Sequence, residues 1–294
     1  MMRFFITYIV LLTLGLATGP QSIYVIQSAY LLSNSSTGIA VNHELNPANV
    51  DFSNQYISFS KNSLIYDLEG QKTAFLNSLN GKYIYFSFES LSSLSIPIYG
   101  ENPSDDTPEG FFDSYWYALE LAQTLNLNNY FSLNSSIQLG YKLKASLYKL
   151  FASKQTNFSI DIGLNKRINS QLSLGFVINN IGLSKNDINQ NQNSGIYDGR
   201  SELGIGVHYL TPSEIVKISG DLYYRNNNFI NKFSLETNFP ILNLSMGTTA
   251  YDGYKDFCYG FIFDLKGWSF IYGYLSFENS NLNSQKSIQI KRKF

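Results

Sequence analysis

The residues whose types could support catalysis or metal binding are few in this chain of 294 residues. The sequence has one cysteine, Cys258, and two histidines, His43 and His208. A single cysteine can form neither an intramolecular disulfide nor a zinc site without other ligands. A serine hydrolase needs a histidine within hydrogen-bond reach of the serine, and no motif marks such a partner for His208. We therefore expect no catalytic residues, no metal and no cofactor.

The carboxylates also form no recognisable metal-binding motif. Asp105, Asp106 and Glu109 fall in the Pro- and Gly-rich stretch 99–110, whose spacing lacks the pattern of a calcium loop. Most other charged residues alternate with apolar ones, so each is expected on the polar face of a strand. We interpret this face as ordinary solvation or as a selectivity lining. Its members are Asp161, Glu202, Asp221, Glu236, Asp264, Lys142, Lys217, Lys232 and Lys266.

The composition points to a surface that is apolar on one side and neutral-polar on the other. Charged residues make up 15% of the chain, against roughly 25% in an average soluble protein. Aromatic residues reach 16%, and the net charge is −1. No basic stripe is present that could neutralise phosphates, which excludes nucleic acid as a partner.

Alternation with a period of two residues dominates the chain from about residue 54 onward, which is typical of strands with one apolar face. Residues 131–143 are an example, with Phe131, Leu133 and Leu139 on one face and Ser132, Asn134 and Gln138 on the other. The pattern predicts about 14 strands, of the length needed to cross a bilayer at a tilt. The predicted segments are 56–66, 72–78, 82–89, 91–98, 111–125, 131–143, 158–164, 172–178, 203–209, 216–224, 229–239, 242–250, 257–265, 268–278 and 284–294.

The sequence predicts three regions along the chain. Residues 1–22 have a short basic start and the apolar run Phe4 to Leu16, which is typical of a cleaved signal peptide. Residues 23–53 do not alternate cleanly, and residues 54–294 carry the strands. Two polar stretches, 99–110 and 184–199, are predicted to be long loops at one rim, with short turns at the other.

Three features favour a transmembrane antiparallel β-barrel of the bacterial outer membrane over a soluble sandwich. The first is the predicted signal peptide. The second is a set of aromatic residues near strand ends that would form interfacial girdles. These are Tyr83, Tyr130, Phe131, Tyr209, Tyr223, Tyr224, Phe239, Tyr251 and Trp268.

The third feature is the C-terminal strand, where Ile288, Ile290 and the terminal Phe294 share one face. This arrangement resembles the assembly signal of outer-membrane barrels. Arg292 lies on the same face, so we expect it near the membrane interface. The partners expected on these grounds are outer-membrane lipid and the barrel-assembly machinery.

The segment 29–50 ends in Asn46-Pro47-Ala48 and resembles the start of the PorV/PorQ family, which is related to FadL-type fatty-acid transporters. The resemblance implies that residues 23–53 form a short plug inside the barrel, with Gly38, Asn46, Pro47 and Ala48 as candidate plug residues. Pro47 fixes its own φ and restricts the preceding residue. It therefore marks either a rigid bend that holds the plug or a plain turn into the first strand.

Further short matches follow in the order expected for that family. They are Glu109-Gly110-Phe111 with Asp113, Asp161-x-Gly163-Leu164, and Asn179-Asn180-Ile181-Gly182. The sequence departs from the family pattern at Asn49, where glycine is usual, and in having Glu44 alone where an acidic pair is common.

Three functional hypotheses follow. The resemblance implies a non-enzymatic accessory barrel of type IX-like protein secretion, whose partners are secreted cargo proteins. The alternative is a FadL-like transporter of hydrophobic small molecules such as long-chain fatty acids, for which a greasy pocket under the plug is expected. An outer-membrane enzyme would instead place His208 against a serine or aspartate in the lumen, and a soluble secreted β-protein would need no detergent.

Overall fold

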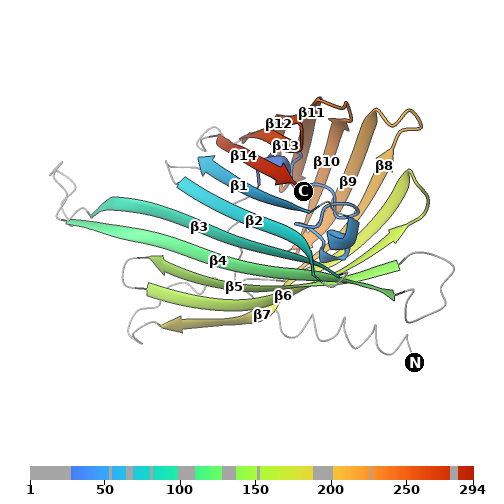
Figure 1. Cartoon of the computed structure of the whole chain (residues 1–294). Helices are drawn as coiled ribbons and strands as arrows, with labels where there is room; N and C mark the ends of the chain where they lie inside the picture. The colour runs from blue at the N-terminus through green and yellow to red at the C-terminus, as the bar shows by residue number, and fades with distance from the viewer. Residues whose placement is uncertain are drawn as a thin grey trace.

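The computed structural model shows a single closed sheet with a short segment inside it (Figure 1). The predicted signal peptide, 1–22, lies outside the described residues. The structure describes residues 28–52, 55–63, 69–79, 82–98, 110–127, 137–150, 153–187, 201–225, 227–278 and 284–294.

The described strands form an antiparallel barrel in which each strand pairs with its neighbours in sequence. The barrel closes between β1 and β14, where Phe59 lies opposite Ile290. This confirms the predicted fold class, including a strand number of 14. The strands are β1 Tyr56–Ser63, β2 Glu69–Leu79, β3 Lys82–Ile98, β4 Gly110–Asn126, β5 Ile137–Leu150, β6 Ser153–Arg167, β7 Leu172–Asp187, β8 Glu202–Leu210, β9 Val216–Arg225, β10 Asn228–Thr237, β11 Leu242–Tyr251, β12 Tyr254–Leu265, β13 Trp268–Ser276 and β14 Gln285–Lys293.

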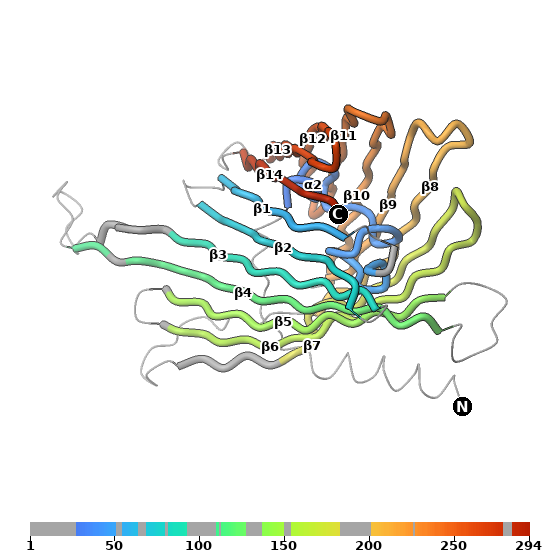
Figure 2. Tube along the Cα trace, in the orientation of Figure 1, coloured from blue at the N-terminus to red at the C-terminus, as the bar shows by residue number. Residues whose placement is uncertain are grey.

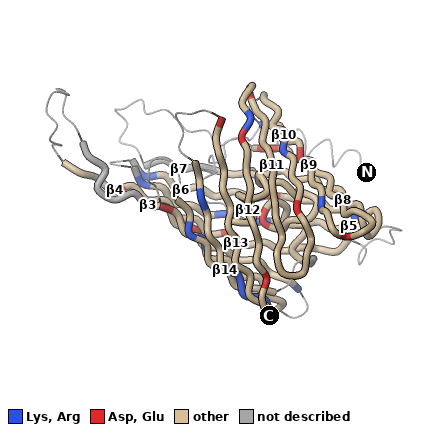
Figure 3. Tube along the Cα trace, turned by 90° about the horizontal axis from the view of Figure 1, so that it is seen from above, with Lys and Arg blue, Asp and Glu red and all other residues tan. Residues whose placement is uncertain are grey.

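The alternation along the strands is apolar outside and polar inside, the reverse of a soluble barrel. In β1, Ile57 and Phe59 are 44% and 47% exposed on the outer face, whereas Ser58 and Ser60 are buried inside. The same order recurs around the wall, and most of the trace carries no charge (Figure 3). A continuous exposed apolar surface of this kind is stable only against lipid.

Some predicted strand boundaries were wrong. Segments 82–89 and 91–98 are one strand, β3, because alternation continues between them without a Gly or Pro break. The segment predicted at 131–143 continues to Leu150 in β5, and its residues 131–136 lie outside the described residues. Strand β7 extends to Asp187, so the stretch 184–199 is not wholly a loop.

The strands differ in length around the barrel. Strands β3 to β7 have 14–17 residues, and β8 to β14 have 9–12. The rim where β1 begins and β14 ends is called the lower rim here, and the opposite one the upper rim. The stretches 99–109 and 188–201 both connect strands at the upper rim.

The aromatic residues of the predicted girdles do not all face outward. Tyr224 and Trp268 are exposed on the outer face, but Tyr223 is only 3% exposed and lies inside, because neighbouring strand residues point to opposite faces. Tyr251 also lines an internal cavity. Tyr130 and Phe131 lie outside the described residues.

Candidate functional site: the plug and the lumen

Residues 28–52, named the plug here, lie inside the barrel and are largely buried. The plug contains the helix α2, Ala29–Ser33, and a 3-10 helix, Pro47–Phe52. Ser28 caps α2, since its Oγ atom accepts a hydrogen bond from the Leu31 N–H. The helix lies against β12, β13 and β14, and the 3-10 helix lies against β4, β5 and β6 (Figure 2). No helix of the described residues is long and apolar enough to span a bilayer.

Asn46 is the buried centre of the plug. Its Nδ2 atom donates to the carbonyl oxygens of Ile39 at 2.9 Å and Leu164 at 3.0 Å, so it links the plug to β6. Its Oδ1 atom accepts from the Ala48 N–H, and Pro47 begins the 3-10 helix. The Asn-Pro-Ala bend therefore lies inside the lumen and is not a turn directly into β1, which begins only at Tyr56.

Gly38 supplies a second attachment to the wall. Its φ of +113° is allowed for glycine, whereas a residue with a side chain would be strained there. This conformation allows the N–H groups of Gly38 and Ile39 to donate to one carboxylate oxygen of Asp221, at 2.7 and 3.2 Å. Asp221 was predicted only as a lumen charge, and the structure shows it anchoring the plug.

Glycines on the inner face of the wall let the plug backbone approach closely, and sequence reasoning missed this role. A Cβ atom on Gly140 would collide with the Pro47–Ala48 peptide, and one on Gly163 with the Asn46 amide. The signal was present in the sequence as glycines on polar faces of successive strands. Further glycines that contact the plug are Gly175, Gly206, Gly247, Gly260 and Gly273.

Cys258 is a free, fully buried thiol on β12 beneath the plug. Its Sγ atom lies 3.0 Å from the Ser35 Oγ atom and donates to the Ser33 carbonyl oxygen at 3.2 Å. This residue therefore has a structural role between wall and plug.

Charged residues meet at the boundary between plug and wall, and of these only Lys142 was among the charges predicted for the lumen. Lys72 of β2 lies 2.9 Å from the Glu44 carboxylate of the plug and 2.8 Å from Glu89 of β3. The ammonium group of Lys142 donates to the Glu44 carbonyl oxygen at 2.6 Å. The side chains of Lys72 and Glu44 are only 6% and 7% exposed, so breaking their contact leaves an uncompensated buried charge.

A second group of charges surrounds a β-bulge between β6 and β7. Lys144 lies 2.7 Å from Asp161, and Lys142 lies 3.9 Å from Asp161 and 3.6 Å from Glu120. The other Asp161 contact is the backbone N–H of Asn180, which has a φ of +61° where the register shifts. Asn179 and Asn180 of the segment singled out in the sequence therefore form the bulge, and Ile181 and Gly182 pair regularly with β6.

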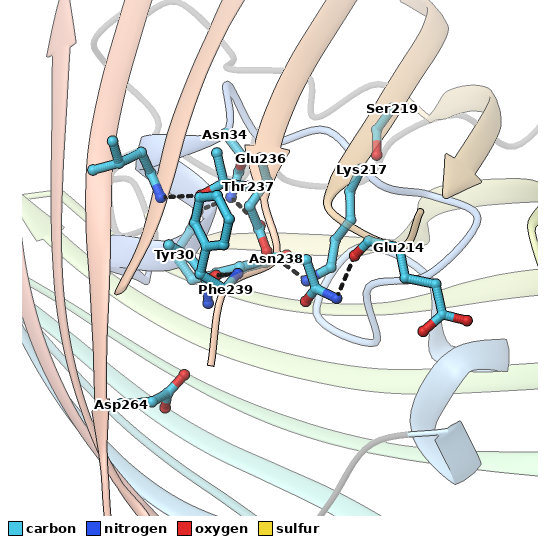
Figure 4. Close-up of polar contacts among 12 residues, drawn as sticks. Tyr30, Asn34, Glu214, Lys217, Ser219, Glu236, Thr237, Asn238, Phe239 and Asp264 are labelled. Carbon is cyan, nitrogen blue, oxygen red and sulfur yellow. Dashed lines mark hydrogen bonds and ion pairs between the residues drawn. The ribbon is translucent and has the colours of Figure 1, made fainter. Parts of the chain in front are cut away.

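Toward the lower rim, the plug is joined to the wall by a hydrogen bond to an ion pair between two wall strands. Lys217 of β9 lies 2.6 Å from Glu236 of β10, and the Asn34 amide of the plug donates to the same carboxylate at 3.4 Å (Figure 4). Lys266 does not belong to the lumen, because it lies in the β12–β13 turn with a φ of +46°. Asp264 pairs with Lys293 at this rim.

Burial controls the ionisation of the two neighbouring plug residues His43 and Glu44. The His43 Nε2 atom lies 2.7 Å from the hydroxyl of Tyr56. Burial lowers the pKa of His43 from 6.5 to about 3, against the opposing effect of Glu44. Burial alone would raise the pKa of Glu44, but the adjacent ammonium group of Lys72 holds that pKa below its ordinary value. The plug thus carries a neutral histidine beside an ionised glutamate at neutral pH.

His208 lies in the lumen against a serine, as the enzyme hypothesis requires. Its Nδ1 atom lies 3.0 Å from the Ser219 Oγ atom. In the described part of the chain, no acid bonds to the other ring nitrogen, and the neighbouring strand amides are used in the barrel ladder. Among the described residues, the pair therefore has no acid that orients the imidazole as in a hydrolase triad. The described residues also contain no group of three or more His, Cys, Asp or Glu residues placed to hold a metal ion.

The larger cavities around the plug, among the described residues, are two vestibules and a side cavity. The upper vestibule, about 160 Å³, lies between plug and upper rim and is lined by Glu44, Glu89, Asp161, Asn179 and Lys232 among others. The lower vestibule, about 270 Å³, is lined by His43, Glu44, His208, Lys217 and Lys291 among others. Glu44 lines both, so it stands at the partition between them. A side cavity of about 360 Å³ shares Ser36, Glu202 and Lys232 with the upper vestibule.

The residues of the predicted assembly signal lie on the outer face of the last strand and at its end. Ile288, Ile290 and Phe294 are 60%, 40% and 73% exposed. Arg292 lies 5.1 Å over the ring of Trp268, which accounts for a cation on this face near the lower rim.

Comparison with known proteins identifies the fold. No family model matches the sequence. No curated protein matches it significantly. Among solved structures, a FadL homologue of Pseudomonas aeruginosa aligns with a TM-score of 0.60 at 8% identity, covering 94% of this chain and 100% of that one. The CymD monoaromatic hydrocarbon channel aligns at 0.57 and 12% identity, covering 95% and 98%. The toluene transporter TodX of Pseudomonas putida aligns at 0.54 and 9% identity, covering 91% and 98%.

These likenesses show that the chain has the barrel fold of the FadL homologue and of the hydrocarbon channels. The solved structures support the FadL-like part of the resemblance seen in the sequence, and they do not show membership of the PorV/PorQ family.

Proposed function

We propose that the protein is a non-enzymatic outer-membrane channel for small molecules, closed by its plug. The observation that carries this proposal is the position of Glu44, which lines both vestibules and is held to the wall by Lys72 and Lys142. Movement of the plug at Glu44 joins the two vestibules into one passage.

The solved structures favour this proposal over the secretion hypothesis. Proteins of the same fold are described as hydrocarbon channels or as a toluene transporter. The small vestibules also suit solutes better than a folded cargo protein. The type IX-like accessory role and the cargo partners that the sequence resemblance implied therefore take second place.

Deletion of residues 28–52 tests the proposal. Purified protein is placed in liposomes, and the release of a small neutral sugar is compared between wild type and the deletion variant. Retained heat-dependent gel mobility shows that the variant barrel is folded. We expect rapid release through the deletion variant and slow release through the wild type. Equal slow release through both folded proteins would contradict a plugged channel.

A further inference from the structure

The charged side chains that line the upper vestibule indicate which class of solute it binds. On the β2–β6 side, Glu44 and Glu89 share Lys72, and Glu120 and Asp161 lie near Lys142 and Lys144. These four carboxyl groups face three ammonium groups, so acid is in excess on this wall. Pockets for purely apolar ligands are mostly lined by hydrophobic and aromatic side chains, which this wall is not.

The opposite wall presents Lys232, which Glu202 and Asp221 attract only from beyond ion-pair distance. Lys232 of β10 has no carboxylate within 4.0 Å among the described residues. Its ammonium group lies 4.6 Å from the Tyr223 ring centroid and 3.5 Å from the Ser36 carbonyl oxygen. Strands β3 and β10 are diametrically opposed in the strand order, seven steps apart in either direction. The acid excess and Lys232 thus lie across the same cavity.

A hydrogen-bond acceptor lies between these two walls. The Asn179 Oδ1 atom on β7 is buried and has no donor among the described residues. Asn179 lines the same vestibule as Glu89 and Lys232. A buried acceptor without a donor is costly, and a donor on a bound solute would remove that cost.

We infer that the upper vestibule binds an elongated zwitterion of the short-peptide class. The ammonium end of the solute faces the Glu44–Glu89 wall, its carboxylate end pairs with Lys232, and a peptide N–H donates to Asn179. The adjoining side cavity, which includes Leu32, Ile230 and Leu275, receives an apolar side chain. A bare hydrocarbon would instead desolvate these charges without replacing their contacts.

This inference rests on the proposed function and names its solute class. The test measures flux into proteoliposomes of a dipeptide, its N-acetylated and C-amidated forms, a neutral sugar of similar size and toluene. Wild-type protein is compared with Lys232→Gln and Glu89→Gln. The control is Lys61→Gln, because Lys61 is an exposed lysine at the upper end of β1.

We expect the dipeptide to pass fastest through the wild type, and each blocked form to pass more slowly. Lys232→Gln should lower the apparent affinity for the dipeptide about tenfold, as expected for loss of a charge-assisted contact. That variant should leave the C-amidated form unaffected, and Glu89→Gln should leave the N-acetylated form unaffected. Faster flux of toluene or sugar than dipeptide, or no effect of Lys232→Gln, overturns the inference. If no solute passes even through the folded plug deletion, the channel proposal itself has failed.

Discussion

The Nζ atom of Lys72 lies 2.9 Å from the Oε2 atom of Glu44, and this contact joins the barrel wall to the plug at the partition between the two vestibules. Both side chains are buried, and Lys72 also contacts Glu89. The pair therefore fixes the plug at the point where a passage through the barrel would open.

Replacement of Lys72 by methionine should release the plug. Removing one partner of a buried ion pair costs about 3–5 kcal/mol, because the other charge stays buried and unpaired. The native thiol of Cys258 lies beneath the plug and reports its undocking. We expect maleimide labelling of Cys258 to accelerate at least about a hundredfold at neutral pH.

The matched control is Lys61→Met. Lys61 pairs with Glu69 at 3.0 Å, but both side chains are more than half exposed, and such pairs contribute roughly 0–1 kcal/mol. Labelling should stay near the wild-type rate in this variant. Similar labelling rates in Lys72→Met and wild type would show that the ion pair does not hold the plug.

Replacement of Gly163 by alanine should displace the plug near Asn46. A Cβ atom at this position overlaps the Asn46 amide, which is itself held by hydrogen bonds to Ile39 and Leu164. We expect a higher open probability in planar bilayers with unchanged heat-dependent gel mobility. Gly220→Ala is the control, since its Cβ would meet the nearest atom only at 3.8 Å. Conductance that rises equally in both variants would indicate a general loosening of the barrel.

Acid should loosen the plug. The pKa of His43 is about 3 in the docked plug and 6.5 for an ordinary histidine. As the pH falls, His43 therefore becomes protonated in the undocked plug before it does so in the docked plug. The contribution of His43 to the free energy of plug docking is therefore fully present above pH 6.5. It falls by about 1.4 kcal/mol per pH unit as the pH drops toward 3. The lowered pKa of Glu44 acts in the same direction, because its contribution is lost as the pH falls through that value.

Single-channel recording across this range measures the effect of acid. Wild-type openings should become more frequent from pH 6.5 downward, and His43→Gln should flatten the upper part of the curve. An open probability that is independent of pH between 6.5 and 4 in the wild type would contradict the role assigned to His43.

The C-terminal aromatic residue is predicted to act in assembly. Phe294 is 73% exposed at the lower rim, so removal of its ring should cost little stability. Phe294→Ser should therefore slow insertion by the barrel-assembly machinery, while protein refolded in detergent melts at the wild-type temperature. Phe239→Ser is the control, because Phe239 is an exposed aromatic in the turn between β10 and β11. Normal insertion of Phe294→Ser would remove the assembly role.

The barrel fold could be predicted from the sequence, because the alternation of apolar and polar residues is a pattern between near neighbours in the chain and repeats in every strand. It showed which side chains face inward, including His208, Lys232 and Asp221. Predicted strand boundaries were wrong where the alternation continues without a turn, as between 82–89 and 91–98. They were also wrong where polar residues continue a strand, as in β7.

The arrangement of the lumen was not accessible from the sequence. The contact between Glu44 and Lys72 depends on how the plug folds back across the barrel, and no periodic pattern encodes this. Glu44 looked only like a departure from a family motif. The greasy pocket expected for a hydrophobic transporter is replaced in the upper vestibule by paired charges, because lysines and carboxylates on neighbouring strands meet there.

Covalent locking of the plug tests the central claim most directly. The Ser35 Oγ atom lies 3.0 Å from the Sγ atom of Cys258, so Ser35→Cys should form a disulfide between plug and β12. If plug movement opens the channel, solute flux through the oxidised variant should fall to the level of empty liposomes and return on reduction, while oxidised wild type stays unchanged. Flux that is the same in the oxidised and reduced variant would show that solutes do not need the plug to move.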